Sequence, residues 1–188
     1  VAGQRVTIDT SGAGLVRFSV DAAAVNAVAA NSGTITAAGG QVAMVASSLG
    51  DALATVVNQS GVIRADSAVE RDGMIVLSGG NNGITRLSGT LSAAGENGRA
   101  GGTVHVLGDK VELTASARID ASGQAGGGTI LVGGDWQGSN PGIANAARTH
   151  VGAGAMLLAD ASQRGDGGKV VVWADGDTRQ LGHISARG

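Results

Sequence analysis

The sequence has no cysteine and no tyrosine, and it has one proline and one phenylalanine among its 188 residues. Without cysteine, neither disulfide bonds nor thiolate metal sites can form within the chain. Aromatic residues make up 2% of the sequence, which excludes a core built on large rings. No apolar run approaches the roughly 18 residues that a membrane span requires. The core must therefore be thin and made of small and aliphatic side chains.

The sequence also has no large excess of charge of either sign. Its 13 Lys and Arg residues and 15 Asp and Glu residues give a net charge of −2. Nucleic-acid binding usually needs a basic stripe, so no nucleic-acid partner is expected. Glycine, in contrast, is abundant, with 34 residues or about 18% of the chain against a usual level of roughly 7%. The glycines follow no strict period of three, which excludes collagen, and they interrupt every heptad run, which excludes a coiled coil.

The strongest signal is a repeated unit in which an Ile or Leu anchor is followed two positions later by a small residue, Ala in six of seven cases. Successive anchors are 27, 28, 28, 28, 38 and 27 residues apart. A second unit, Gly-x-Φ-x-Φ with Φ apolar, follows each of the first six anchors, and a weaker apolar segment precedes several of the anchors. Alternation with period two is typical of strands that have one face in a core. The anchors are Ile8, Ile35, Ile63, Leu91, Ile119, Leu157 and Ile184.

Three short strands in each repeat of about 28 residues predict an all-β fold, a parallel β-helix (solenoid) of about seven coils with the anchors stacked in one inward ladder. The alternative is an antiparallel β-sandwich, whose hairpins would carry Asn-Gly or Asp-Gly turns. Asn82-Gly83 and Asp72-Gly73 are such pairs, but they do not lie between equivalent strands. We expect residues 1–188 to form a single β-helix segment excised from a longer chain.

Two stretches depart from the repeat. Residues 21–30 are rich in alanine and could form either a short helix capped by Asp21 or an extended connection. The coil of 38 residues contains an insertion of about ten residues, within 133–148, which must leave the helix as a loop between the second and third strands. A regular rod presents similar surfaces coil after coil, so a specific site is expected where the repeat breaks.

The insertion holds Trp136, the one aromatic residue within it, and two interpretations of this residue stay open. The first is structural: outward residues on the anchor strands are mostly polar, and Met156 and Leu158 are the exception, so the loop would fold back to cover them. The second is functional: the indole would be a platform for the apolar face of a sugar ring. The polysaccharide-binding residues would then be Trp136, Asp135, Gln137 and Asn140, with Asn145 as a further amide.

No catalytic residue, cofactor or metal site is expected. Enzymes resembling pectate lyases share the β-helical fold, but Asp9 and Asp120 would lie about four coils, or ~19 Å, apart on the anchor face. Carboxylate pairs in glycosidases lie within ~5–10 Å of each other. The three histidines, His105, His150 and His183, fall on three different types of strand, which argues against a zinc site.

Several units resemble one family. Residues 58–65 (NQSGVIRA), 101–108 (GGTVHVLG), 182–188 (GHISARG) and especially 165–179 (GDGGKVVVWADGDTR) are similar to filamentous-haemagglutinin-like exoproteins of two-partner secretion. The resemblance covers most of the chain from about residue 25 and implies a right-handed parallel β-helix. It also implies an outer-membrane β-barrel transporter as partner. The Asn-Pro-Asn-Gly motif of the secretion domain is absent from the sequence, which predicts a segment downstream of that domain.

The function that this resemblance implies is the β-helical shaft of a large secreted adhesin of a Gram-negative bacterium. Such a protein acts at the cell surface or in the extracellular matrix, in attachment or biofilm cohesion. Binding of a polysaccharide or of a host or bacterial surface glycan would be the local activity. The alternatives are a passive stalk that presents an adhesive or toxic module elsewhere in the chain and, from another class, a carbohydrate-active enzyme.

Overall fold

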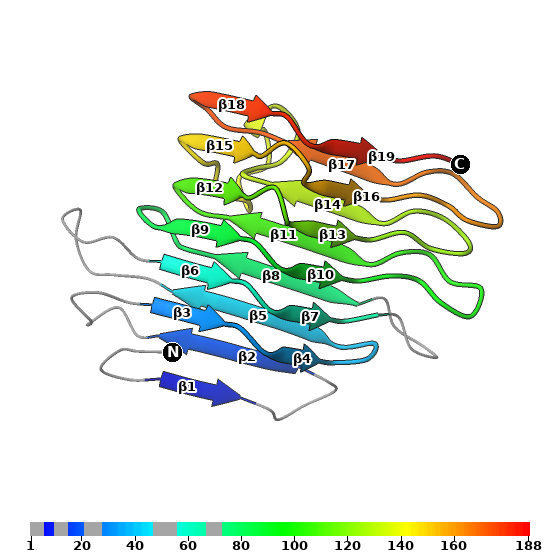
Figure 1. Cartoon of the computed structure of the whole chain (residues 1–188), viewed down its shortest axis with the longest axis horizontal. Helices are drawn as coiled ribbons and strands as arrows, with labels where there is room; N and C mark the ends of the chain where they lie inside the picture. Colours follow the sequence, from blue (N-terminus) through cyan, green and yellow to red (C-terminus); the bar gives the residue numbers. More distant parts are fainter. Residues whose placement is uncertain (1–5, 10–14, 21–27, 47–55, 67–72) are drawn as a thin grey trace.

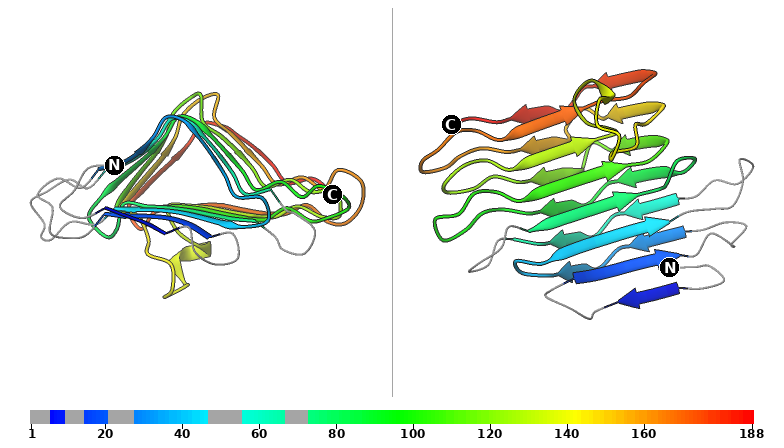
Figure 2. Two further views of the ribbon diagram at one scale, coloured as in Figure 1. Left: turned by 90° about the horizontal axis from the view of Figure 1, so that it is seen from below. Right: turned by 180° about the vertical axis from the view of Figure 1, so that it is seen from behind.

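The computed structural model describes residues 6–9, 15–20, 28–46, 56–66 and 73–188. In this part of the chain the strands form three sheets around one core, and the cross-section is triangular when viewed along the stack (Figures 1 and 2). Each coil contributes one strand to each sheet in a fixed order, and equivalent strands of successive coils pair in parallel. The fold is therefore the all-β parallel β-helix that the repeats predict.

We number the sheets in the order in which a coil visits them. Sheet 1 consists of β1 (Val6–Asp9), β2 (Leu15–Val20), β5 (Gln41–Ala46), β8 (Met74–Ser78), β11 (Thr103–Leu107), β14 (Thr129–Val132) and β17 (Lys169–Val172). Sheet 2 consists of β3 (Val28–Asn31), β6 (Val56–Gln59), β9 (Ile84–Leu87), β12 (Lys110–Leu113), β15 (Arg148–Val151) and β18 (Asp177–Gln180). Sheet 3 consists of β4 (Thr34–Thr36), β7 (Val62–Arg64), β10 (Thr90–Ser92), β13 (Arg118–Asp120), β16 (Met156–Leu158) and β19 (His183–Ser185).

The anchor ladder is confirmed from its second member onward. Ile63 is the register partner of Ile35 and of Leu91, and the same inward row of sheet 3 continues through Ile119, Leu157 and Ile184. The prediction that Ile8 begins this ladder is wrong. It lies on β1, which pairs antiparallel with β2 in sheet 1 and places Ile8 opposite Phe18. The described strands therefore make six parallel coils preceded by one antiparallel strand, where the sequence predicted about seven coils.

The winding of the coils is right-handed, as the family resemblance implies. In Figure 1 the chain rises from coil to coil, and the strands of sheets 2 and 3 run to the right in front of the strands of sheet 1, which run to the left. The view from behind in Figure 2 confirms that sheet 1 lies at the back. Residues 21–27, which the sequence left open between helix and extended chain, lie outside the described residues, and Val28–Asn31 is strand β3.

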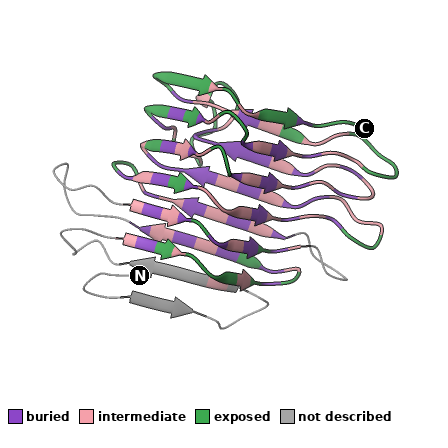
Figure 3. Ribbon diagram, in the orientation of Figure 1, coloured by how far each residue is buried: buried purple, intermediate pink, exposed green. Residues whose placement is uncertain are grey.

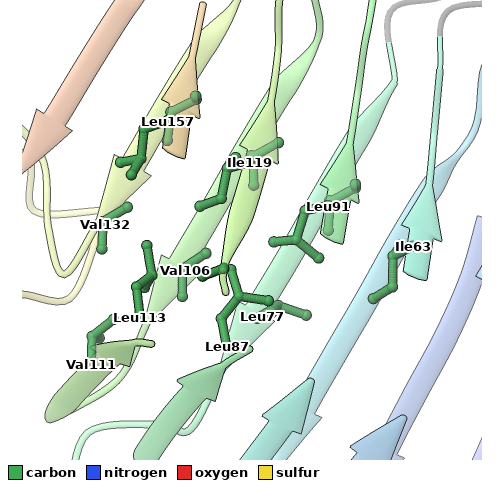
Figure 4. Close-up of a cluster of buried hydrophobic side chains, with 14 of the residues drawn as sticks. Ile63, Leu77, Leu87, Leu91, Val106, Val111, Leu113, Ile119, Val132 and Leu157 are labelled. Atoms are coloured by element: carbon green, nitrogen blue, oxygen red, sulfur yellow. The ribbon is translucent and has the colours of Figure 1, made fainter. Parts of the chain in front are cut away.

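The core is a stack of short aliphatic rows, one or two from each sheet (Figure 4). Ile63, Leu91, Ile119 and Leu157 are fully buried, and the alanines two positions beyond them fill the narrow corner where larger side chains would not fit. Ile184 occupies the same row in the last described coil, but 40% of its surface is exposed because no further coil lies on it. Burial of each row thus depends on the coils on both sides.

Two threonines occupy inward positions of sheet 2, where the other buried positions of the same row are apolar. Thr85 and Thr149 follow Val57 and Val111 in one row, and both are buried. The Thr85 hydroxyl donates to the Leu107 carbonyl oxygen at 2.6 Å and accepts from the Gly79 backbone N–H at 3.0 Å. These bonds hold the corner between sheets 1 and 2, where the backbone bends away from the regular ladder.

Replacing Thr85 by Val should lower the free energy of unfolding by about 1–3 kcal/mol, because the buried corner loses a hydroxyl partner while the side-chain volume is kept. Thermal denaturation followed by circular dichroism measures the change. Thr90→Val is the matched control, since Thr90 lies half-buried on the outward face of sheet 3. Equal midpoints for the two variants would show that the Thr85 bonds do not stabilise the corner.

Candidate functional site

The largest excursion from the coil lies between β14 and β15. Residues 133–147, which we call the Trp136 loop, leave the end of sheet 1, form the short 3-10 turn η1 (Trp136–Gly138) and return to sheet 2. Figure 2 shows this segment in yellow, projecting from the outer face of sheet 1. No comparable projection interrupts the neighbouring described coils β8–β13, whose corners between sheets 1 and 2 are short.

The loop covers part of the outer face of sheet 1. Leu131 and Val171 are register partners on β14 and β17, and they alternate with inward residues, so both point away from the core. They are nevertheless only 3% and 6% exposed. An outward leucine on a β-helix is buried only when another segment packs on it, and we infer that the Trp136 loop, which lies on this face and is joined to β17 by Asp135 and Lys169, provides that cover.

One carboxylate holds the loop in place. Asp135 accepts from the Lys169 ammonium group at 2.6 Å, from the Asn140 amide at 3.0 Å and from the Trp136 backbone N–H at 2.7 Å. Lys169 is the first residue of β17, so this contact joins the loop to the next coil. The hydrogen bond from Lys169, followed by those from Asn140 and Trp136, holds the pKa of Asp135 well below its usual range.

Two glycines let the loop lie close to the second tryptophan. A Cβ atom on Gly134 would lie 2.9 Å from Cδ1 of Trp173, and one on Gly138 would lie 3.0 Å from its Nε1. The Trp173 indole N–H donates to Asp175 at 3.1 Å. Asn145 closes the loop by donating from its amide to the Gly138 carbonyl oxygen at 3.2 Å. Trp173 is thus part of the support under the loop, a role that its sequence motif did not reveal.

The four residues predicted for polysaccharide binding divide into two pairs. Asp135 and Asn140 bond to each other and shape the loop. Trp136 and Gln137 face solvent, with 63% of the tryptophan exposed. Gln137 has positive φ (55°), a conformation that few residues other than glycine and asparagine adopt, so the turn presents this pair at some local cost.

The expectation that Trp136 covers Met156 and Leu158 is wrong. Both residues lie on β16 in sheet 3, whereas the loop packs on sheet 1, and Trp136 itself is exposed. Cover for Met156 comes from its ladder neighbour Arg118, whose guanidinium group lies 3.5 Å from the sulfur atom. The long arginine stem shields apolar surface while its charged group stays near Asp120 at 3.1 Å.

His105 lies in the same outward row as Leu131 and is half-buried. Burial lowers the pKa of His105, and the nearby charge of Asp135 opposes part of that effect. A histidine with a lowered pKa stabilises the fold at neutral pH, and this contribution is lost as the pH falls from the unfolded value of about 6.5 toward the folded value.

Asp135→Asn should weaken the attachment of the loop at pH 7, because the lysine loses its charged partner. The pKa of Asp135 is depressed in the folded state, so its stabilisation is present above the unfolded carboxyl pKa of about 3.9 and is lost as the pH falls below it. The difference in melting midpoint between wild type and variant should therefore shrink below about pH 4. Tryptophan fluorescence, which reports Trp136 and Trp173, follows the loop directly. A difference that stays constant from pH 7 to pH 3 would contradict this role of the carboxylate.

Within the described residues, no group of three His, Asp or Glu side chains is close enough together to hold a metal ion. Among the same residues, no helix has the length and apolar character to cross a bilayer. The loop presents an exposed indole and is braced by the ion pair between Asp135 and Lys169, a geometry suited to stacking on a flat apolar surface.

Comparison with known proteins finds a match among solved structures. No model of a protein family matches the sequence, and no curated protein matches it. Among solved structures, the secretion domain of HMW1 from Haemophilus influenzae is 34% identical, with a TM-score of 0.74 over 86% of this chain. The alignment spans 40% of that chain. The similarity is to a secretion domain itself, whereas the sequence predicted a segment downstream of one.

Proposed function

Because this chain is a parallel β-helix of the two-partner-secretion type, similar to filamentous-haemagglutinin exoproteins, we propose that it is a segment of a secreted adhesin that takes part in attachment. The observation that carries the proposal is the similarity to the HMW1 secretion domain over 86% of the chain. The parent protein would be exported through an outer-membrane β-barrel transporter and would act at the surface or in the matrix of a Gram-negative bacterium.

The architecture suits export of an unfolded chain. Each described coil pairs with the coil before it through all three sheets, so a new coil can form on an existing edge as soon as it emerges. The absence of cysteine means that no disulfide bond restricts threading. Folding outside the cell would then draw the chain forward, with no need for a catalytic centre in the segment.

The attachment site in this proposal is the Trp136 loop, and its ligand class is a surface or matrix polysaccharide. Of the two tryptophans, Trp136 is exposed and Trp173 is half-buried. Gln137 beside it offers an amide for sugar hydroxyl groups, while Asp135 and Asn140 fix the turn that presents both. An indole gives a large contact area at low entropic cost, which favours stacking on a pyranose ring.

Trp136→Ala should leave the melting midpoint nearly unchanged, since exposed residues typically contribute within about 0.5 kcal/mol. Binding to the uncharged polysaccharides that the wild-type chain recognises on a glycan array should weaken about tenfold or more, because the stacking surface is removed. Calorimetric titration with each array hit measures the affinity. Leu181→Ala is the control, because Leu181 is also an exposed apolar residue but lies away from the loop.

Two results would reject the loop as the attachment site. One is unchanged affinity in Trp136→Ala. The other is a wild-type chain that binds no polysaccharide, which would leave a stalk presenting a module elsewhere in the parent protein. Depolymerisation of a bound polysaccharide by the wild-type chain would instead favour the enzyme alternative.

A further inference from the structure

The outer face of sheet 2 carries a concentration of basic side chains on four successive strands, β9, β12, β15 and β18. They border an open depression of about 340 Å³. This face lies on a different sheet from the Trp136 loop, and Figure 3 shows exposed residues on all four strands. The residues that matter here are Ile84, Arg86, Lys110, Arg148, His150 and Arg179.

Two like charges face each other at the centre of this surface. Lys110 and Arg148 are register partners on adjacent strands, about 4.8 Å apart in backbone spacing. Like charges directly opposite each other in a sheet destabilise the pairing. Arg148 lies 3.7 Å from Asp177 in a contact in which the two side chains are 71% and 86% exposed, so the pair is weak. Lys110 has no ion pair among the described residues.

The remaining acidic residue does not neutralise the centre. Glu112 already forms an ion pair with Arg86, in which the guanidinium group of Arg86 lies 2.8 Å from the carboxylate of Glu112. Arg179, on the other side, has no ion pair within the part of the chain that the structure describes. Lys110 and Arg179 are therefore left without counter-charges, and Arg148 is poorly compensated. Where residues break a local pairing rule without a structural gain, a functional role is the usual reason.

We propose that this face binds an acidic polysaccharide through the carboxylate groups of its sugar units. The basic residues follow one another from strand to strand, so they line up along the axis of the β-helix, and an extended polyanion lying along the rod would meet them in turn. Arginine and lysine form strong charge-assisted bonds with carboxylates. Ile84, half-buried at one end, offers an apolar contact for a sugar ring. The open, shallow shape fits a linear chain better than a compact ligand.

Nucleic acid fits this surface less well than an acidic polysaccharide. Single-stranded nucleic acid is usually held by aromatic side chains that stack on the bases, and no aromatic residue lines the depression. The whole chain also has a net charge of −2, without the broad basic field typical of nucleic-acid-binding domains. The site goes beyond the Trp136 loop, because it needs charge on the ligand and does not involve the indole.

The test compares Lys110→Gln/Arg179→Gln with Arg64→Gln/Arg164→Gln. Each double variant removes two exposed positive charges, and the second pair lies away from sheet 2. Polygalacturonate is the probe, dextran is the neutral polysaccharide and duplex DNA is the competing polyanion. The wild-type chain should bind polygalacturonate in preference to dextran and DNA, with affinity that falls as salt is added. The first variant should lose about tenfold or more in affinity, and the control should stay within about twofold.

Circular dichroism should show that neither double variant melts below the wild type, because all four side chains are exposed and Lys110→Gln removes the like charge opposite Arg148. Trp136→Ala should keep its affinity for polygalacturonate, which separates this site from the loop. The proposal is overturned if the wild type does not bind polygalacturonate, if dextran or DNA binds equally well, or if both double variants lose affinity to the same extent. The last result would mean that net charge alone drives binding.

Discussion

Gly128→Ala is expected to lower the free energy of unfolding by about 3 kcal/mol or more, because the added methyl group has no room. Gly128 lies at the corner that leads from sheet 3 into β14, where its N–H donates to the Ala121 carbonyl oxygen at 2.8 Å. A Cβ atom there would fall on the backbone carbonyl oxygen of Gly102, far inside van der Waals contact. Gly102 and Gly168 occupy the same corner in the coils on either side and have equivalent clashes. The backbone of one coil therefore touches the next at this corner, and a side chain would force them apart.

Thermal and urea denaturation of Gly128→Ala and of Gly33→Ala measure this effect. Gly33 is exposed, and a Cβ atom there would meet nothing closer than 3.9 Å, so the control should melt near the wild type. A similar loss of stability in the two variants would contradict this account. It would mean that replacing any glycine destabilises the fold, and that close packing of the backbone is not the reason why glycine is required at this corner.

Leu91→Ala should destabilise the fold by about 2–5 kcal/mol, because it leaves a cavity in the middle of the anchor ladder. Leu91 is fully buried and is flanked by Ile63 and Ile119, which lie in register on β7 and β13 (Figure 4). The backbone of the parallel strands on both sides limits how far the coil can collapse into the gap. The loss should therefore fall in the upper part of that range.

The comparison variant for Leu91→Ala is Ile184→Ala. Ile184 occupies the same ladder in the last described coil and is 40% exposed, so it should lose much less stability. Denaturant titrations of the two variants give the difference in free energy. A loss at position 184 that equals the loss at 91 would contradict the dependence of burial on stacking from both sides.

Spacing in the sequence predicts the interior of this protein well because a β-helix repeats its geometry every coil. The Gly-x-Φ-x-Φ units at residues 40–44, 73–77, 102–106, 128–132 and 168–172 all align in register in sheet 1, as their equivalent positions require. Ile8 shows the limit of this method. Period two identifies the apolar face of a strand but is the same for parallel and antiparallel pairing, so the direction of β1 could not be read from it.

The position of the Trp136 loop could have been predicted from a signal in the same strands. Residues 130–132 (Ile-Leu-Val) and 170–172 (Val-Val-Val) are unbroken apolar runs, which are typical of strands buried on both faces. Their outward members, Leu131 and Val171, are the residues that the loop covers. The prediction from the sequence considered outward positions on the anchor strands alone. It therefore expected the loop to cover Met156 and Leu158, which lie on sheet 3 and not on sheet 1.

The basic face of sheet 2 could not be predicted from the sequence. Its basic residues come from four different coils, and the strands of sheet 2 have the weakest apolar pattern of the three sheets. Thr85 and Thr149 occupy inward positions there, which weakens the apolar alternation that would have fixed the register of β9 and β15. Without that register, nothing placed Lys110 beside Arg148, which is 38 residues away in the chain because of the insertion.

Export of the parent protein by its own bacterium tests the central claim most directly. Antibody against this segment should detect the protein in the culture medium and on intact cells of the wild-type strain. In a strain that lacks the proposed outer-membrane β-barrel transporter, the same protein should stay inside the outer membrane and resist protease added to intact cells. Restoring the transporter should restore surface exposure. Equal surface exposure with and without the transporter would contradict the assignment to two-partner secretion.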